Sequence, residues 1–293
     1  MRRIGIIILG LAAAGLLALF VVRPERIAPE ALAGLTGDAT RGEVLYNAAG
    51  CAGCHTAPDS EDRQRLAGGQ RITSPFGTFL VPNISTDPDH GIGTWTDEEL
   101  VTAMLKGTSP DGAHYYPAFP YASYARGTVQ EALDIATYLR TLPADPTPSL
   151  PHELGFPFNL RVTLGGWKLL FLKPDWVVPD EALTTDGQRL GRALVESWGH
   201  CGECHTPRNA LGGPQLGNWL AGGPNPSGEG RIPDIRPAAL QWSANDIAAY
   251  LDSGFTPDFD TAGGEMVEVI ENMALLPDGH RAAIADYLTA LPD

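Results

Sequence analysis

Two pentapeptides, Cys51-Ala52-Gly53-Cys54-His55 and Cys201-Gly202-Glu203-Cys204-His205, contain all four cysteines of this chain. In a Cys-x-x-Cys-His motif the two thiols bond covalently to the vinyl groups of a haem, and the adjacent imidazole coordinates the iron. Each motif therefore supplies two attachment cysteines and one axial histidine. The sequence predicts two covalently attached haem c groups.

The spacing of the motifs weighs against other uses of paired cysteines. A zinc site made of two Cys-x-x-Cys knuckles needs them roughly 15 to 20 residues apart, whereas nearly half the chain separates these two. A thioredoxin-like redox pair requires a βαβ pattern around it. Residues 42–46 and 191–195, just before the motifs, instead predict short helices.

Length and charge bound the function further. The 293 residues provide room for about two domains, one for each motif. The chain has 20 basic and 35 acidic residues and a formal charge of −15, which argues against nucleic-acid binding. Such a charge favours solubility, and it also steers a protein toward a basic redox partner.

Residues 4–22 form an uncharged apolar run that is long enough to cross a bilayer once as a helix. This predicts a cytoplasmic N-terminus at residues 1–3, a transmembrane anchor at 4–22 and a linker at 23–37. A cleaved signal peptide, with Ala31-Leu32-Ala33 as its small-residue site, is the alternative. The predicted location is the bacterial inner membrane, with a single pass and the haem domains on the periplasmic side.

The two halves of the chain repeat one pattern. Both carry a helix that starts at a hydroxyl residue, has an acid three positions later and ends at glycine, as well as a similar closing helix. The matching segments are 66–69 with 220–223, 81–84 with 232–235, 94–107 with 241–254, and 135–143 with 284–292. The repeat predicts two copies of one helical domain, at 38–143 and 181–293.

Strand-like alternation of useful length is missing from the sequence, so the predicted fold is all-α: a single N-terminal transmembrane helix followed by two tandem helical domains. The connector between them, residues 144–180, is too apolar to be a free linker. We expect a helix packed across both domains. The alternative is a docking surface for the membrane or for a partner subunit.

The sixth iron ligand of the second haem is predicted to be Met266. This methionine lies twelve residues beyond Gly254, in the loop after the middle helix of its domain, where a thioether can reach the iron. Methionine more often fills core gaps, but a haem domain without a better candidate favours ligation. Met273 is the alternative.

The first copy differs at this point. Phe119 stands twelve residues beyond Gly107, and a phenyl ring has no lone pair to give to iron. His114, on the same loop, is the predicted substitute, and a five-coordinate haem is the other outcome. Weaker candidates are His90, Tyr115, Tyr116 and Met104, the last of which has a core role as its simpler explanation.

Several further motifs resemble the cytochrome c subunits of membrane-bound alcohol, gluconate and aldehyde dehydrogenases. The resemblance covers about residues 38–293, and its motifs are 66–69, 75–78, 82–85, 91–93, 111–112, 116–121 and 199–208. It implies two tandem class I cytochrome c domains that pass electrons from a catalytic dehydrogenase subunit onward. Those subunits commonly carry three haem domains, and many have methionine at the position of Phe119.

We expect an electron-transfer protein, since motifs for hydrolytic nucleophiles and phosphate loops are missing from the sequence. The expected donor is a dehydrogenase catalytic subunit, and the expected acceptor is a soluble cytochrome, a quinone or a terminal oxidase. The alternative is an enzyme of the dihaem peroxidase or thiosulfate dehydrogenase type, with an open distal site on the first haem.

Overall fold

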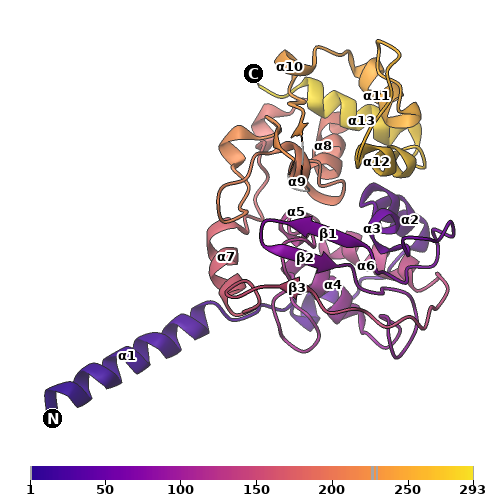
Figure 1. Ribbon diagram of the computed structural model, residues 1–293. Coiled ribbons are helices and arrows are strands. Elements are labelled where there is room, and N and C mark those ends of the chain that lie inside the picture. Colours follow the sequence, from indigo (N-terminus) through magenta and orange to yellow (C-terminus); the bar gives the residue numbers. More distant parts are fainter. Residues whose placement is uncertain (1, 226–227, 229, 293) are drawn as a thin grey trace.

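The computed structural model describes residues 2–225, 228 and 230–292. The body of the molecule consists of two helical halves, with α7 (Thr163–Phe171) beside their junction (Figure 1). The helices of the first half are α2 (Ala39–Ala48), α3 (Cys51–His55), α4 (Asp97–Lys106), α5 (Tyr121–Tyr124) and α6 (Val129–Leu139). Those of the second half are α8 (Asp186–Arg192), α9 (Gly202–His205), α10 (Pro237–Leu240), α11 (Ala244–Ser253), α12 (Met266–Met273) and α13 (Asp278–Thr289).

Helical turns of other kinds join these elements. A π-helical stretch at Ala193–Trp198 continues α8, and 3₁₀ turns occur at Pro29–Leu32, Asp180–Ala182 and Leu216–Asn218. A π-helical stretch contains more residues per turn than an α-helix. The segment from Gly191 to Cys201 is one residue longer than the matching segment from Gly42 to Cys51. The π-helical stretch accommodates this extra residue.

The capping signals of the repeated middle helix are confirmed. Thr96 and Glu99 form a reciprocal capping box at the start of α4, and Ser243 and Asp246 form the same box at the start of α11. Each helix ends at a glycine with left-handed backbone, Gly107 at φ 57° and Gly254 at φ 75°. Glycine adopts this conformation without the penalty that a Cβ atom imposes.

In each half, the helix before the motif packs against the closing helix, α2 on α6 and α8 on α13. A glycine allows the close approach in both pairs. A Cβ atom on Gly42 would lie 2.0 Å from the carbonyl oxygen of Asp134, and one on Gly191 would lie 1.9 Å from that of Ala283. Any larger residue would force these helices apart, since packed interiors leave no such space.

Short strands correct the all-α prediction. Strands β1 (Arg71–Ser74), β2 (Gly77–Leu80) and β3 (Glu153–Leu154) form an antiparallel sheet in that order, and β4 (Gly223–Pro224) pairs with β5 (Arg231–Ile232). The strands are only two to four residues long. Alternation over so few residues does not rise above irregular sequence, and β3 comes from the distant connector.

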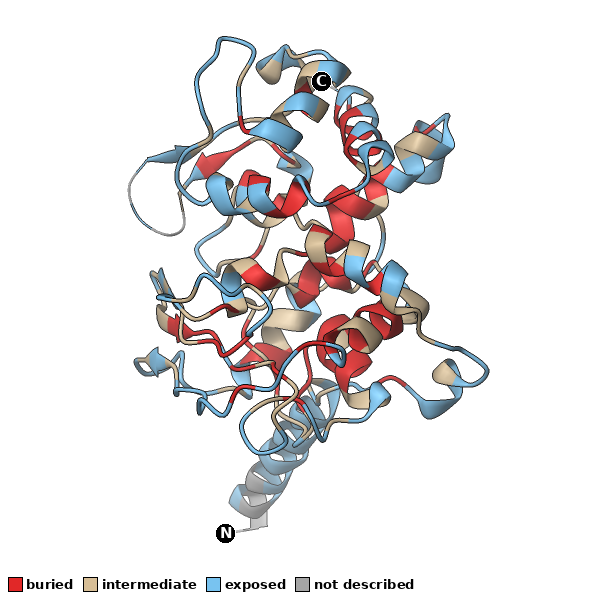
Figure 2. Ribbon diagram, turned by 90° about the vertical axis from the view of Figure 1, so that its right-hand side faces the viewer, coloured by how far each residue is buried: buried red, intermediate tan, exposed pale blue. Residues whose placement is uncertain are grey.

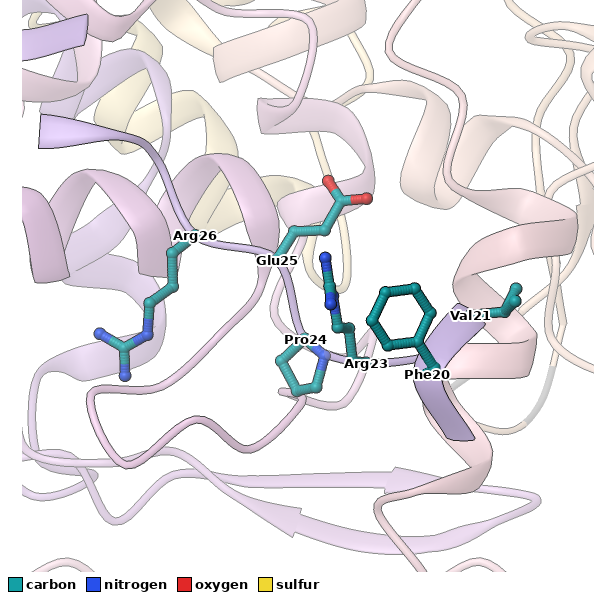
Figure 3. A pocket seen from close by; sticks show the side chains of 6 residues that line it. All are labelled: Phe20, Val21, Arg23, Pro24, Glu25 and Arg26. Carbon is teal, nitrogen blue, oxygen red and sulfur yellow. The ribbon is translucent and has the colours of Figure 1, made fainter. Parts of the chain in front are cut away.

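Helix α1 (Arg2–Val21) projects from the body, and the side chains described along it are exposed (Figure 1). Where it joins the body, Phe20 and Val21 line an open hollow with residues 23–26, and the Arg23 guanidinium carbon lies 4.1 Å from the centre of the Phe20 ring (Figure 3). Within the described residues, no helix combines the length and apolarity that crossing a membrane requires. The prediction of a transmembrane anchor at residues 4–22, which rested on the length and apolarity of that run, is therefore wrong.

The two halves share one hydrophobic core. Buried residues continue through their junction (Figure 2), and a single cluster extends from Tyr46 and Leu100 in the first half to Trp198 and Ile284 in the second. The halves are therefore held together by apolar burial as well as by the chain that joins them.

The connector helix α7 packs across both halves, as the sequence predicts. On the first half, the Lys168 ammonium donates to the carbonyl oxygens of Lys106 (2.6 Å) and Gly107 (2.7 Å) at the C-terminus of α4, where a cation is favoured. On the second half, the Trp167 indole donates to the carbonyl oxygen of Leu211 at 3.0 Å. The side chains of Leu169 and others on the outer face stay exposed.

Candidate haem attachment sites

Both Cys-x-x-Cys-His motifs fold as a single helical turn: α3 spans the whole first motif, and α9 spans the second motif after Cys201, which is its N-cap. The residue before each motif has left-handed backbone, Gly50 at φ 61° and His200 at φ 39°. Such a conformation is ordinary for glycine and strained for histidine. The strain at His200 is opposed by a contact across the junction, since its Nε2 lies 3.2 Å from the carbonyl oxygen of Ala49.

The motif histidines are oriented by backbone carbonyls. His55 Nδ1 lies 2.8 Å from the carbonyl oxygen of Pro82, and His205 Nδ1 lies 2.9 Å from that of Pro233. A carbonyl only accepts hydrogen bonds, so Nδ1 must carry the proton. The lone pair is then on Nε2, which is the nitrogen available to a metal.

The protonation state of these histidines suits iron binding. Burial lowers the pKa of His55 to about 4 and lowers the pKa of His205 as well, while the carbonyl contacts oppose the shift. Both imidazoles are therefore neutral near pH 7. A neutral imidazole with its Nδ1–H held by a carbonyl is the form in which histidine ligates metals.

The four cysteines are not joined in disulfides. Burial raises the pKa of Cys51 and of Cys201 to about 12, so these thiols are protonated. Cys54 and Cys204 are exposed. Each motif thus presents two unpaired thiols beside one neutral imidazole, and this donor set fits a covalently bound haem, which would contribute the redox-active iron.

The two candidates for the sixth iron ligand of the second haem lie at opposite ends of α12. Met266 is the first residue of α12 and is half-buried, whereas Met273 is 3% exposed and belongs to the hydrophobic core. The ligation of the second haem by Met266 stays a prediction.

His114 is buried in a different environment. It is 4% exposed, and its Nε2 lies 2.8 Å from the carbonyl oxygen of Val22. A Cβ atom on Gly165 of α7 would come within 2.9 Å of the same nitrogen. Nε2 thus faces the N-terminal segment and α7, whereas Nδ1 is buried without a hydrogen-bond partner among the described residues. The prediction of His114 as a ligand stays a prediction.

Phe119 is surrounded by aromatic rings. It makes edge contacts with Tyr115 and Tyr124, both at 5.8 Å between ring centres, and with Tyr121 at 6.4 Å. Among the weaker candidates, Met104 is buried in the core, which confirms its simpler explanation. His90 is exposed.

A stacked aromatic pair crosses the junction between the halves. Tyr124 of α5 and Trp198, just before the second motif, lie 5.1 Å apart between ring centres at an interplanar angle of 29°, and both are buried. Ser123, next to Tyr124, donates to Glu203 of the second motif at 2.6 Å. The first half thus contacts the second attachment site directly.

A buried carboxylate also lies at this junction. Glu196 is fully buried and accepts hydrogen bonds from the backbone N–H groups of Val177 (2.5 Å) and Val178 (2.9 Å) and from the Tyr287 hydroxyl (2.6 Å). The Arg126 guanidinium of the first half lies 4.0 Å away. Burial raises the pKa of Glu196, and these partners oppose the shift.

Sequence reasoning missed the two carbonyls that orient the histidines. Their signal is present in the repeat, because Val81-Pro82-Asn83-Ile84 matches Ile232-Pro233-Asp234-Ile235. A backbone carbonyl is not visible in residue identity, so the match could not assign it a role. Only the fold brings these segments onto the motif histidines.

Comparisons with known proteins agree with this geometry. The cytochrome c family matches residues 39–143. The chain is 56% identical over 281 residues to a "Diheme cytochrome c-type" protein of Cereibacter sphaeroides, covering 95% of this chain and 94% of that protein.

Two dehydrogenase subunits are also similar. The fructose dehydrogenase cytochrome subunit of Gluconobacter japonicus is 40% identical, and the cytochrome c subunit of the alcohol dehydrogenase (quinone) of Gluconobacter oxydans is 33% identical. Each match covers 86% of this chain but only 52% and 54% of those subunits, so the chain spans about half their length. With two equivalent attachment sites and a relative matched over nearly its whole length, the chain belongs to the dihaem c-type cytochromes and carries two covalently bound haem c groups.

Proposed function

We propose that this cytochrome relays electrons from the catalytic subunit of a dehydrogenase, through its first haem and then its second, to a downstream respiratory acceptor. The observation that carries the proposal is the proximity of the two attachment sites. Nε2 of His200, the residue directly before the second motif, lies 3.2 Å from the carbonyl oxygen of Ala49, two residues before the first motif.

The direction of flow follows from the proposed ligands. Methionine ligation raises the potential of a haem, so the haem held by His205 and Met266 is the higher one. The first haem, with Phe119 at the matching position, is bis-histidine or five-coordinate and lies lower. Electrons therefore pass from the first half to the second.

The partners are proposed from the relatives. Since several are cytochrome subunits of dehydrogenases, the donor is a dehydrogenase catalytic subunit. The acceptor is a soluble cytochrome, a quinone or a terminal oxidase. Covalent haem attachment to Cys-x-x-Cys-His is extracytoplasmic in bacteria, so we place the haem-bearing halves on the periplasmic side.

A redox titration followed by absorbance and electron paramagnetic resonance tests the order of the haems. We expect two separate midpoint potentials, with the higher one assigned to the second haem by its loss in Met266→Ala. A midpoint potential of the first haem equal to or above that of the second would overturn the proposed direction of electron flow.

Carbon monoxide distinguishes electron transfer from the enzymatic alternative. If the first haem bound carbon monoxide or peroxide readily in the wild type, a dihaem peroxidase or thiosulfate dehydrogenase activity would become the better explanation. A low-spin spectrum that these ligands leave unchanged supports the relay. Phe119→Met, which supplies a thioether at the matching position, should raise the first potential.

A further inference from the structure

The two halves pack in a crossed arrangement. Helix α5, which follows Phe119 in the first half, packs on the π-helical stretch before the second motif. Helix α12, which begins at Met266 in the second half, packs on α2 and α3 around the first motif (Figure 1). The helix that follows Phe119 therefore packs on the second half, and the helix that begins at Met266 packs on the first half.

Arg63, on the loop after the first motif, adds two hydrogen bonds to the contact of α12 with the first half. Its guanidinium donates to Glu271 Oε2 at 2.7 Å and to Asn272 Oδ1 at 2.9 Å. Asn272 is 3% exposed, and its own amide donates to the carbonyl oxygen of Glu268 at 2.7 Å. Arg63 thus binds the C-terminal turn of α12 through Glu271 and Asn272. The hydrogen bond from Asn272 to Glu268 connects this turn to the preceding one.

The N-terminal part of α12 fits directly against the first attachment helix. A Cβ atom on Gly53, inside the first motif, would lie 2.7 Å from Glu268 Oε2 and 3.5 Å from Asn272 Nδ2. Helix α12 therefore borders the first motif through Glu268 and Asn272.

We propose that Arg63 is a positioning residue for the sixth ligand of the second haem. Residues in the first half fix α12, and α12 carries Met266 at its start, about 8 Å along the helix axis from the turn that Arg63 holds. Because a hydrogen-bonded helix of two turns moves as a unit, release of this turn loosens Met266. The proposal rests on the proposed ligation of the second haem by Met266.

Arg65 provides a matched control. It lies two residues from Arg63 on the same loop, and its guanidinium pairs with Asp145 at 3.0 Å, within the chain segment that follows the first half. Arg65→Ala removes an arginine and an ion pair but leaves the contacts of α12 in place.

The test compares Arg63→Ala, Arg65→Ala and wild type as oxidised holoproteins. Methionine ligation is followed through the near-infrared methionine-to-iron charge-transfer band while imidazole displaces the ligand. We expect displacement about tenfold faster in Arg63→Ala, which corresponds to about 1.4 kcal/mol, together with a lower potential of the second haem. Arg65→Ala should match wild type, and Arg63→Lys should recover part of the rate because its ammonium still reaches one acceptor.

Equal displacement rates in Arg63→Ala and Arg65→Ala would refute the positioning role. If Arg63→Ala does not fold, Glu271→Gln replaces it: this exposed substitution removes only the ion pair, and an unchanged rate there would count against the proposal. Failure of the ligand assignment is seen separately, because the band would then persist in Met266→Ala. A band that depends on Met266 but not on Arg63 overturns this inference alone.

Discussion

The two attachment sites are alike on one side of the haem and different on the other. His55 and His205 are held by prolyl carbonyls at almost the same distance, 2.8 Å and 2.9 Å. Twelve residues after the glycine that ends the middle helix, one half has Phe119 among aromatic rings and the other has Met266 at the start of α12. The comparison teaches that the two halves share the attachment motif and the histidine–carbonyl contact. They differ in the segments that contain Phe119 and Met266, and in how these segments pack on the opposite half.

The largest expected effect is the loss of one haem. Replacing Cys201 and Cys204 together with alanine removes both thioether bonds of the second site, so covalently bound haem falls from two per chain to one. The pyridine haemochrome absorbance per chain, after acid–acetone extraction of free haem, measures this. The mirror variant at Cys51 and Cys54 should lose the other haem, and a content that stays at two would disprove the assignment.

Replacing Met266 tests the difference between the sites. In Met266→Ala the potential of the second haem should fall by on the order of 0.1 V, a modest part of the range of about 0.8 V that axial ligands span. Met273→Ala is the control: it removes a buried side chain and costs about 2–5 kcal/mol of stability, but it should leave the potential in place. Spectroelectrochemistry and thermal unfolding separate the two results. If the potential fell in Met273→Ala and stayed in place in Met266→Ala, Met273 would be the ligand.

The residue five positions before the first cysteine of each motif provides a stability comparison. Glu196→Ala leaves Arg126 buried without its carboxylate and should cost about 3–5 kcal/mol. Tyr46→Phe removes a hydroxyl that has no hydrogen-bond partner in the described part of the chain, so its cost should stay below about 1 kcal/mol. Denaturant unfolding of the holoproteins measures both, and equal losses would show that the Glu196 carboxylate does not stabilise the buried Arg126.

The smallest expected effects concern the residue before each motif. Gly50→Ala places a Cβ atom on left-handed backbone and should destabilise by about 1–2 kcal/mol. His200→Gly relieves strain of similar size but loses the contact with Ala49, so its net change should be smaller. Melting temperatures of the two variants should therefore differ. A larger loss in His200→Gly would show that the contact across the junction outweighs the strain.

Local features of the fold could be predicted because they depend on neighbouring residues. The capping boxes at Thr96 and Ser243 and the glycine ends of α4 and α11 follow from spacing along the chain. The attachment motifs are equally local. The helix across the connector was predicted from composition, since so apolar a segment needs cover.

The remaining features depend on contacts between distant segments. Strand β3 pairs with a hairpin that lies far back in the chain, and the carbonyls of Pro82 and Pro233 approach the histidines only in the folded protein. The burial of His114 against Val22 likewise could not be read from the loop that contains it. The anchor at residues 4–22 was predicted from the length and apolarity of that run and was wrong.

The crossed packing has a consequence for the order in which the chain matures. Because α12 follows both motifs along the chain, the surface of α3 that it contacts stays uncovered until the second half has been made. The second attachment segment meets α5, which is synthesised before it. The first motif is therefore accessible to the attachment machinery for longer than the second, and the molecule closes over its earlier haem only when α12 has been made.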